Sequence, residues 1–366
     1  MSDASAIATP PPAPVLAEAA PPPRPAASAP AIRWYRTPIE REAMKQVLKK
    51  SDLLAALQTG GFLATITATG ATVICAYAAG LWWAILPLLF LHGMVMSFLI
   101  NGVHELRHET VFTNRRVNRF FAALLAFPGW INHHHFAESH GRHHRYTMHP
   151  PADLEVTLPV TIRWRDFWRQ GFCNLSWPAW SVQGTWNTAR GRFDGDWNRA
   201  IFPESDPGKR RPVVRWAWTL LIGHGVILAV SLAMHWWIVP LVVSFAPIFG
   251  AWLFWLCNNT QHVGLQDNVA DARLCCRTIV INPIARFLYW HMNFHTEHHM
   301  FAAAPCYRLG KLHRLMRDDL PPCPVGLVAT WTHIMEVMRK QAADASYRHV
   351  ASLPAARAVA VAAPTT

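Results

Sequence analysis

Hydrophobic residues predominate in four segments that are each long enough to cross a bilayer. They occupy approximately residues 60–80, 81–103, 213–235 and 236–257. About 20 apolar residues in a helix span the hydrocarbon core of a membrane, so the pattern predicts four transmembrane helices. The connections at Gly80-Leu81 and His235-Trp236 are very short. We therefore expect the four helices to form two hairpins.

Positive charge is distributed unevenly around these segments. Residues 33–50 carry six Lys or Arg and residues 104–212 carry fifteen, whereas the two hairpin connections carry none. Basic loops are retained in the cytoplasm. We predict that both termini and the region between the hairpins are cytoplasmic. The high content of Ala, Pro and Arg is typical of a bacterial source, in which the membrane would be the inner membrane.

Two shorter apolar stretches, 117–131 and 279–291, cannot span a bilayer. In the first, the apolar side chains of Phe120, Phe121, Leu124 and Leu125 follow the basic ones of Arg115, Arg116 and Arg119. This pattern is typical of a helix that lies in the membrane interface. The prediction is an all-α integral membrane fold in which a cytosolic helical cap covers the four spans.

The ends of the chain differ in composition from its centre. Residues 1–31 are almost entirely Ala, Pro and Ser, without the basic and apolar regions of a signal peptide. Residues 344–366 are rich in Ala. We interpret both as disordered tails, which leaves 32–343 as one folded domain.

Composition supports a membrane protein over a nucleic-acid-binding one. Charged residues make up 15% of the chain, against about 25% in an average soluble domain. The 18 Trp suit membrane interfaces, and the net charge of +12 suits anionic lipid head groups. The seven Cys include no Cys-x-x-Cys pair. We interpret these thiols, the adjacent Cys275 and Cys276 included, as reduced and mostly structural.

Histidines cluster between the apolar segments at helical spacing. The clusters are His104-Glu-Leu-Arg-His108, His140-Gly-Arg-His143-His144 and His295-Thr-Glu-His298-His299. Residues three and four apart share one face of a helix, so each cluster can direct its rings to one point. Asn258 and His262 have the same i, i+4 spacing where the last apolar segment ends. Imidazole binds Fe, Zn, Cu and Ni, and nine histidines suffice for two ions, with Asn258 reaching a bound water.

Carboxylates near these histidines are expected to orient the rings by accepting the free ring N–H. The candidates are Glu105, Glu138, Asp153 and Glu297. Two further histidines, His92 and His224, fall inside predicted spans. We interpret them as hydrogen-bonded between helices, with a functional role as the alternative.

The three boxes HxxxH, HxxHH and HxxHH, divided by a hydrophobic hairpin, resemble the membrane fatty acid desaturase and hydroxylase superfamily over about residues 50–315. The resemblance implies that the nine histidines hold two iron ions on the cytosolic side, with Asn258 acting through water and O2 as co-substrate. It also implies that the substrate is an acyl chain on a lipid or carrier. The first box has three intervening residues, whereas the acyl-CoA branch usually has four. In this respect the first box resembles that of alkane hydroxylases.

Other functions are compatible with part of this pattern. The same centre would support hydroxylation, or desaturation of a small non-lipid metabolite. A non-catalytic metal-binding membrane protein is a more distant alternative. His104-Glu105-x-x-His108 also matches the zinc protease signature, which leaves the other seven histidines unexplained.

The chain has no evident electron-transfer module of its own. It has no His-Pro-Gly-Gly, no clustered cysteines for an iron–sulfur centre and no GxGxxG fingerprint. We predict a separate ferredoxin or cytochrome that is reduced by an NAD(P)H reductase. The basic cytosolic face would attract an acidic carrier.

Overall fold

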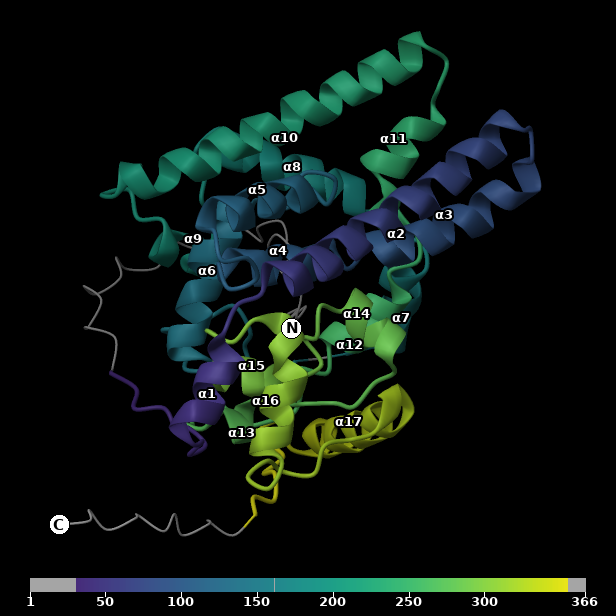
Figure 1. Cartoon of the computed structure of the whole chain (residues 1–366). Helices are drawn as coiled ribbons and strands as arrows, with labels where there is room; N and C mark the ends of the chain where they lie inside the picture. Colours follow the sequence, from purple (N-terminus) through teal and green to yellow (C-terminus); the bar gives the residue numbers. More distant parts are fainter. Residues whose placement is uncertain (1–30, 161, 355–366) are drawn as a thin grey trace, which may run out of the picture.

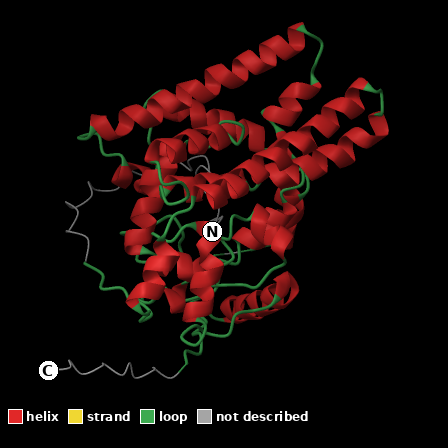
Figure 2. Ribbon diagram, in the orientation of Figure 1, coloured by secondary structure: helices red, strands yellow, loops and turns green. Residues whose placement is uncertain are grey.

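The computed structural model describes residues 31–160 and 162–354. This part of the chain consists of helices and loops, with isolated β-bridges in place of strands (Figure 2). The all-α prediction is confirmed for these residues.

Three helical segments are long and apolar enough to cross a membrane: 52–78, 82–107 and 207–233. The first is α2 (Asp52–Ala78) and the third is α10 (Pro207–Ala233). The second joins α3 (Trp82–Met96) to α4 (Leu99–Arg107) through a slight break. These helices form the upper part of the molecule, with α2 and α3 side by side (Figure 1). The first predicted hairpin is thus present.

The fourth predicted span, 236–257, is not one continuous helix. It divides into α11 (Ile238–Val243), the 3₁₀ turn η1 (Ala246–Ile248) and α12 (Trp252–Asn258). Pro247 lacks an N–H to donate within a helix, and Gly250 has a φ of 69°. The second hairpin of two full-length helices is therefore not confirmed.

Side chains from neighbouring parts of the chain pair with polar groups of this irregular segment, including two of its backbone carbonyls. The His92 Nε2 lies 3.0 Å from the Val242 carbonyl oxygen, and the Trp130 indole donates to the Ser244 carbonyl oxygen at 2.8 Å. The His224 Nδ1 lies 2.8 Å from the Ser244 hydroxyl. Unpaired backbone groups are costly in apolar surroundings. These contacts support the structural interpretation of His92 and His224.

Glycines allow the irregular segment to pack backbone to backbone against α3. A Cβ on Gly93 would lie 2.0 Å from the Phe249 carbonyl oxygen and 2.5 Å from that of Ala246. A Cβ on Gly250 would lie 2.1 Å from the Phe90 carbonyl oxygen. Only glycine fits at these two positions, so they fix where the irregular segment crosses α3.

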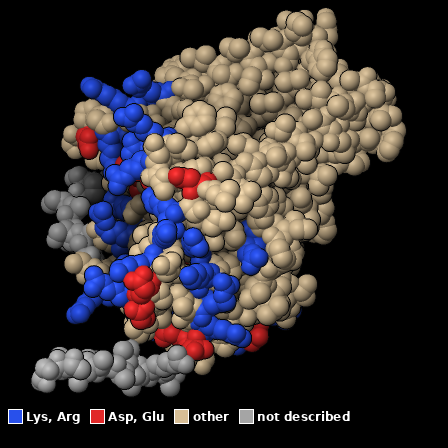
Figure 3. Space-filling view, viewed as in Figure 1, with Lys and Arg blue, Asp and Glu red and all other residues tan. Residues whose placement is uncertain are grey.

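The remaining helices are shorter than the three apolar segments that could span a membrane. They are α1 (Arg41–Leu48), α5 (Arg115–Ala126), α6 (His133–Tyr146), α7 (Trp164–Gly171), α8 (Trp177–Ala189), α9 (Asp196–Ile201), α13 (Ala272–Cys275), α14 (Pro283–Leu288), α15 (His295–Met300), the 3₁₀ turn η2 (Cys306–Arg308), α16 (Leu309–Met316) and α17 (Gly326–Ala343). The two predicted interfacial stretches contain α5 and the short α14. The upper right of the molecule, where the long helices end, shows no charged residue on the visible face, whereas Lys and Arg gather along the left side and the lower part (Figure 3).

The largest apolar cluster joins the long helices to the lower part of the molecule. Trp290 is fully buried, and its ring packs edge-on against Phe62 of α2, with 5.5 Å between centroids. A Cβ on Gly102 of α4 would lie 2.8 Å from the Trp290 ring. The helix α4, which carries the first histidine box just after Gly102, therefore packs directly against this tryptophan.

The predicted tails lie largely outside the described residues, which exclude 1–30 and 355–366. Residues just after α17 make contacts with the domain. The Gln341 side chain donates to the Tyr347 carbonyl oxygen, and the His349 N–H donates to that of Gly264 at 2.9 Å.

Gly93→Ala should destabilise the fold, because the new methyl group would collide with two backbone carbonyls that cannot rotate away. We expect a loss of about 1–3 kcal/mol, seen as a lower Tm in detergent. The matched control is Gly60→Ala in α2, where a Cβ meets nothing within 4 Å. A wild-type Tm for Gly93→Ala would contradict the backbone-to-backbone packing.

Candidate metal centre

Four parts of the chain bring the predicted histidines together. The helix α4 carries His104, His108 is the C-cap residue that follows it, and α6 carries the second box. The third box lies on α15, and His262 lies in a bend just after α12. All four converge beneath the long helices.

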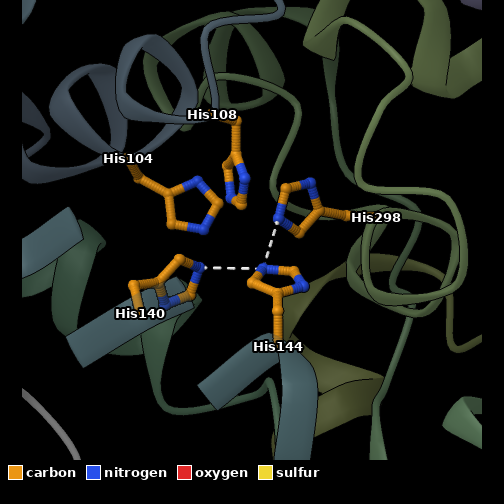
Figure 4. Close-up of side chains that lie close together, drawn as sticks. All are labelled: His104, His108, His140, His144 and His298. Carbon is orange, nitrogen blue, oxygen red and sulfur yellow. Dashed lines mark hydrogen bonds between the residues drawn. The ribbon is translucent and has the colours of Figure 1, made fainter. Parts of the chain in front are cut away.

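The first group of histidines is made by three of these elements. Its members are His104, His108, His140, His144 and His298. One ring nitrogen from each lies within 4.8 Å of those of all the others. The rings surround a common centre (Figure 4). The boxes are far apart in sequence, and only their packing creates this arrangement.

A second group lies beside the first. The ligand atoms of His262, His295, His299 and Cys276 are all within 4.8 Å of one another. His143 borders this group: its ring centroid is 5.2 Å from that of His262 and 5.0 Å from that of His299. The structure thus places all nine predicted histidines in or beside two adjacent groups. The Cys276 thiol was not predicted there.

Two of the predicted carboxylates hold histidine rings as expected. The Glu105 carboxylate lies 2.9 Å from His104 Nδ1, and that of Asp153 lies 2.8 Å from His143 Nδ1. Both carboxylates are fully buried. A proton shared at Nδ1 leaves the lone pair of Nε2 free to bind a metal.

Glu138 does not have this role in the structure. It pairs with Lys209 at 2.7 Å and is partly exposed. Residues two positions apart on a helix point in nearly opposite directions, so Glu138 turns away from His140. The carboxylate that reaches His140 Nδ1, at 2.9 Å, belongs to Glu155. Sequence reasoning missed Glu155, and the only signal that could have indicated it is its position two residues after Asp153.

Within the part of the chain that the structure describes, Glu297 and Asn258, which were also predicted to support the metal ligands, make no hydrogen bond to the nine histidines. Glu297 is buried and accepts hydrogen bonds from the Thr278 hydroxyl and the His313 ring. It holds α15 in place instead of touching a ligand ring. Among the described residues, the Asn258 side chain makes no hydrogen bond to any of the nine histidines, which leaves its predicted action through a water as a prediction.

Unpaired ring nitrogens show that the site suits cations. The Nε2 atoms of His104, His108 and His299 are buried without a hydrogen-bond partner. Leaving a buried polar atom unpaired is costly. A metal ion bound at these nitrogens would remove that cost.

The closest nitrogen pairs support the same conclusion. His262 Nδ1 donates to the Cys275 carbonyl oxygen at 2.7 Å, so its Nε2 carries a lone pair. That Nε2 lies 2.9 Å from His295 Nε2, and the Nε2 atoms of His140 and His144 are also 2.9 Å apart. Two nitrogens bound at right angles about 2.1 Å from one ion would lie roughly 3.0 Å apart. The spacing is that of neighbouring ligands.

Burial keeps most of these rings in the form that binds metal. Loss of solvation lowers the pKa of His108 to about 4 and holds those of His140 and His298 well below the usual value. Burial also opposes charging of His143, but the adjacent Asp153 carboxylate outweighs it and raises the pKa of His143 to about 9. Neutral imidazole is the ligand form, so the first group is ready to bind at neutral pH.

The family model described as fatty acid desaturase matches residues 81–331, which is more than half of the chain and includes both groups. The chain belongs to the fatty acid desaturase family. Together with the three apolar helices, this membership indicates an integral membrane oxidoreductase. A search of curated proteins found no match.

A segment outside the matched range closes one side of the desaturase centre. Trp34 and Tyr35 line a small cavity of about 50 Å³ with His144 and His299. The Trp34 indole donates to the Arg145 carbonyl oxygen at 3.2 Å. The residues before α1 thus cover the histidine groups on this side.

Glu155→Gln should weaken metal binding, because the amide cannot hold the His140 ring as a carboxylate does. Loss of such an outer partner typically lowers metal affinity 10–100-fold. The measurement is the iron retained by the purified protein during titration with a chelator. Glu138→Gln is the control and should behave as wild type. Equal retention by both variants would contradict the role of Glu155.

Proposed function

We propose that the protein is an O2-dependent di-iron membrane enzyme that desaturates the acyl chain of a lipid or carrier-bound fatty acid. The observation that carries the proposal is the pair of adjacent, buried groups of inward-facing imidazoles in a member of the fatty acid desaturase family. A single zinc site, as in a protease, would need only three or four of these ligands.

Two iron ions would supply the redox chemistry with O2 that cleavage of an unactivated C–H bond requires. The first would be held by the group of five histidines, and the second by His262, His295 and His299 with His143 beside them. The overall reaction removes two hydrogens from adjacent carbons and reduces O2 to two waters. It therefore consumes two further electrons and two protons.

The residues around the centre orient the rings and keep water out. Glu105, Asp153 and Glu155 each hold one ring by its Nδ1. The Phe136 ring stacks parallel to that of His140, with 5.0 Å between centroids. His298 is completely buried. Charges in such a dry site interact more strongly than in water, and side reactions with solvent are suppressed.

The position of the first box favours a substrate from the membrane. His104 lies in the last turns of a helical segment, 82–107, that is apolar enough to span a bilayer. An acyl chain in the hydrocarbon layer would reach this end of the helix without crossing water. We propose that this end faces the cytoplasm, because Lys and Arg gather on the same part of the molecule (Figure 3). In a bacterium the membrane would be the inner membrane.

The test is mass spectrometry of lipids and polar metabolites from cells that express the wild type or His298→Ala. We expect a product that lacks two hydrogens in the wild type only, because His298 contributes to the first group. His235→Asn is the control. His235 lies in an exposed turn with a φ of 57°, a conformation that Asn tolerates, and should leave the product unchanged.

Each other result identifies a different function. A product that gains one oxygen would establish a hydroxylase. A new polar metabolite in place of a lipid would establish a non-lipid substrate. Bound iron with no product, in cells shown to contain a working electron donor, would favour a non-catalytic metal-binding protein.

Electrons are proposed to come from a separate ferredoxin or cytochrome that an NAD(P)H reductase supplies. The purified chain should give no turnover with NADPH alone and should turn over when carrier and reductase are added. Because the exposed basic residues would attract an acidic carrier, the rate should fall as ionic strength rises. Full turnover with NADPH and this chain alone would overturn the proposal.

A further inference from the structure

A thiol stands among the histidines of the second group. The Cys276 Sγ lies within 4.8 Å of a ring nitrogen from each of His262, His295 and His299. Cys276 is 2% exposed. The other group contains only histidines, so the two halves of the centre differ in the atoms they offer.

Hydrogen bonds on one flank fix the backbone of Cys276 beside His262. The Cys275 carbonyl oxygen accepts from His262 Nδ1 at 2.7 Å. The Arg277 N–H donates to the Gln261 carbonyl oxygen at 2.8 Å. The residues on both sides of Cys276 are thus bound to the bend that carries His262.

The other flank is bound to α15, which carries His295 and His299. The Thr296 hydroxyl donates to the Cys276 carbonyl oxygen at 3.2 Å, and the Thr296 N–H donates to the Thr278 hydroxyl at 3.3 Å. The thiol therefore lies between its three histidine neighbours because its own backbone is held between them.

The histidines around the thiol also have free ligand atoms. The buried His299 Nε2 has no hydrogen-bond partner, and the Nε2 atoms of His262 and His295 lie 2.9 Å apart, which is the spacing of neighbouring ligands. Other buried cysteines, Cys257 and Cys306, are not part of any such group among the described residues. Close convergence of nitrogen and sulfur ligands on one point is typical of a metal site.

We propose that Cys276 is a ligand of the second metal ion, which it binds as a thiolate together with His262, His295 and His299. The proposal rests on the proposed function, because it requires that this group holds an ion. Burial raises the pKa of the free Cys276 thiol well above its usual value, but a bound cation displaces the proton of a coordinating thiol.

A thiolate would make the two metal positions unequal. It carries a full negative charge, whereas the imidazoles of the first group are neutral. It is also a softer ligand, which favours iron, cobalt or zinc over manganese or magnesium. The second position would thus hold a more strongly neutralised ion than the first.

The experiment uses Co²⁺ as a spectroscopic probe in the full-length protein, purified in detergent and depleted of metal. Thiolate ligation gives cobalt an intense near-ultraviolet charge-transfer absorption that imidazole does not give. We expect this absorption in the wild type and its loss in Cys276→Ser. The matched control is Cys275→Ser: its thiol lies 3.8 Å from that of Cys276 but outside the group, so the absorption should remain.

X-ray absorption at the cobalt edge of the wild type provides a measurement that needs no variant. We expect one sulfur for every two cobalt ions, at about 2.3 Å. This result keeps the test valid even where Cys276→Ser does not fold.

The amount of bound cobalt distinguishes a failure of the thiolate ligand from a failure of the proposed metal centre. Two bound ions without charge-transfer absorption or sulfur scattering would overturn the role of Cys276 and leave the proposed metal centre intact. Absorption that persists in Cys276→Ser, or is lost only in Cys275→Ser, would also overturn it. No cobalt binding by the wild type would overturn both the thiolate ligand and the metal centre.

Discussion

Buried imidazole lone pairs impose the constraint on which the rest of this structure depends. Ring nitrogens of His140, His144, His262 and His295 face each other at 2.9 Å, and others have no partner at all. A proton can join each close pair as a hydrogen bond, but the buried nitrogens that have no partner carry a cost that a bound cation would remove. The carboxylates that bind the opposite ring nitrogens, and the dry surroundings, both serve to hold these lone pairs inward.

The fold satisfies this constraint by joining distant helix ends. The helix α4 continues the apolar segment 82–107 and is seated on the buried Trp290. The broken segment after α10 ends in α12, from which the chain bends to deliver His262. Close backbone contact at Gly93 and Gly250 fixes the path of that segment. An unbroken fourth helix would lack the contacts at this crossing.

The surroundings of the rings were the least predictable part of the site. Glu155 and Cys276 reach the histidines from loops, whereas Glu138, two positions before His140 on α6, turns away from it. Helical spacing reports which residues share a face, but not which loop packs against that face. Glu105 and Asp153 were predictable because one adjoins its histidine and the other follows the second box closely.

The sequence by itself was sufficient to predict the helical class, three of the apolar helices and which nine histidines would come together. Hydrophobic runs and i, i+3, i+4 spacing are local properties of the chain. The sequence also carried the family resemblance, since that rests on the boxes alone. Only the tertiary structure decided that residues 236–257 break, that the histidines divide into two groups, and that Cys276 joins one of them. Those outcomes depend on contacts between residues far apart in sequence, whose energies no local pattern contains.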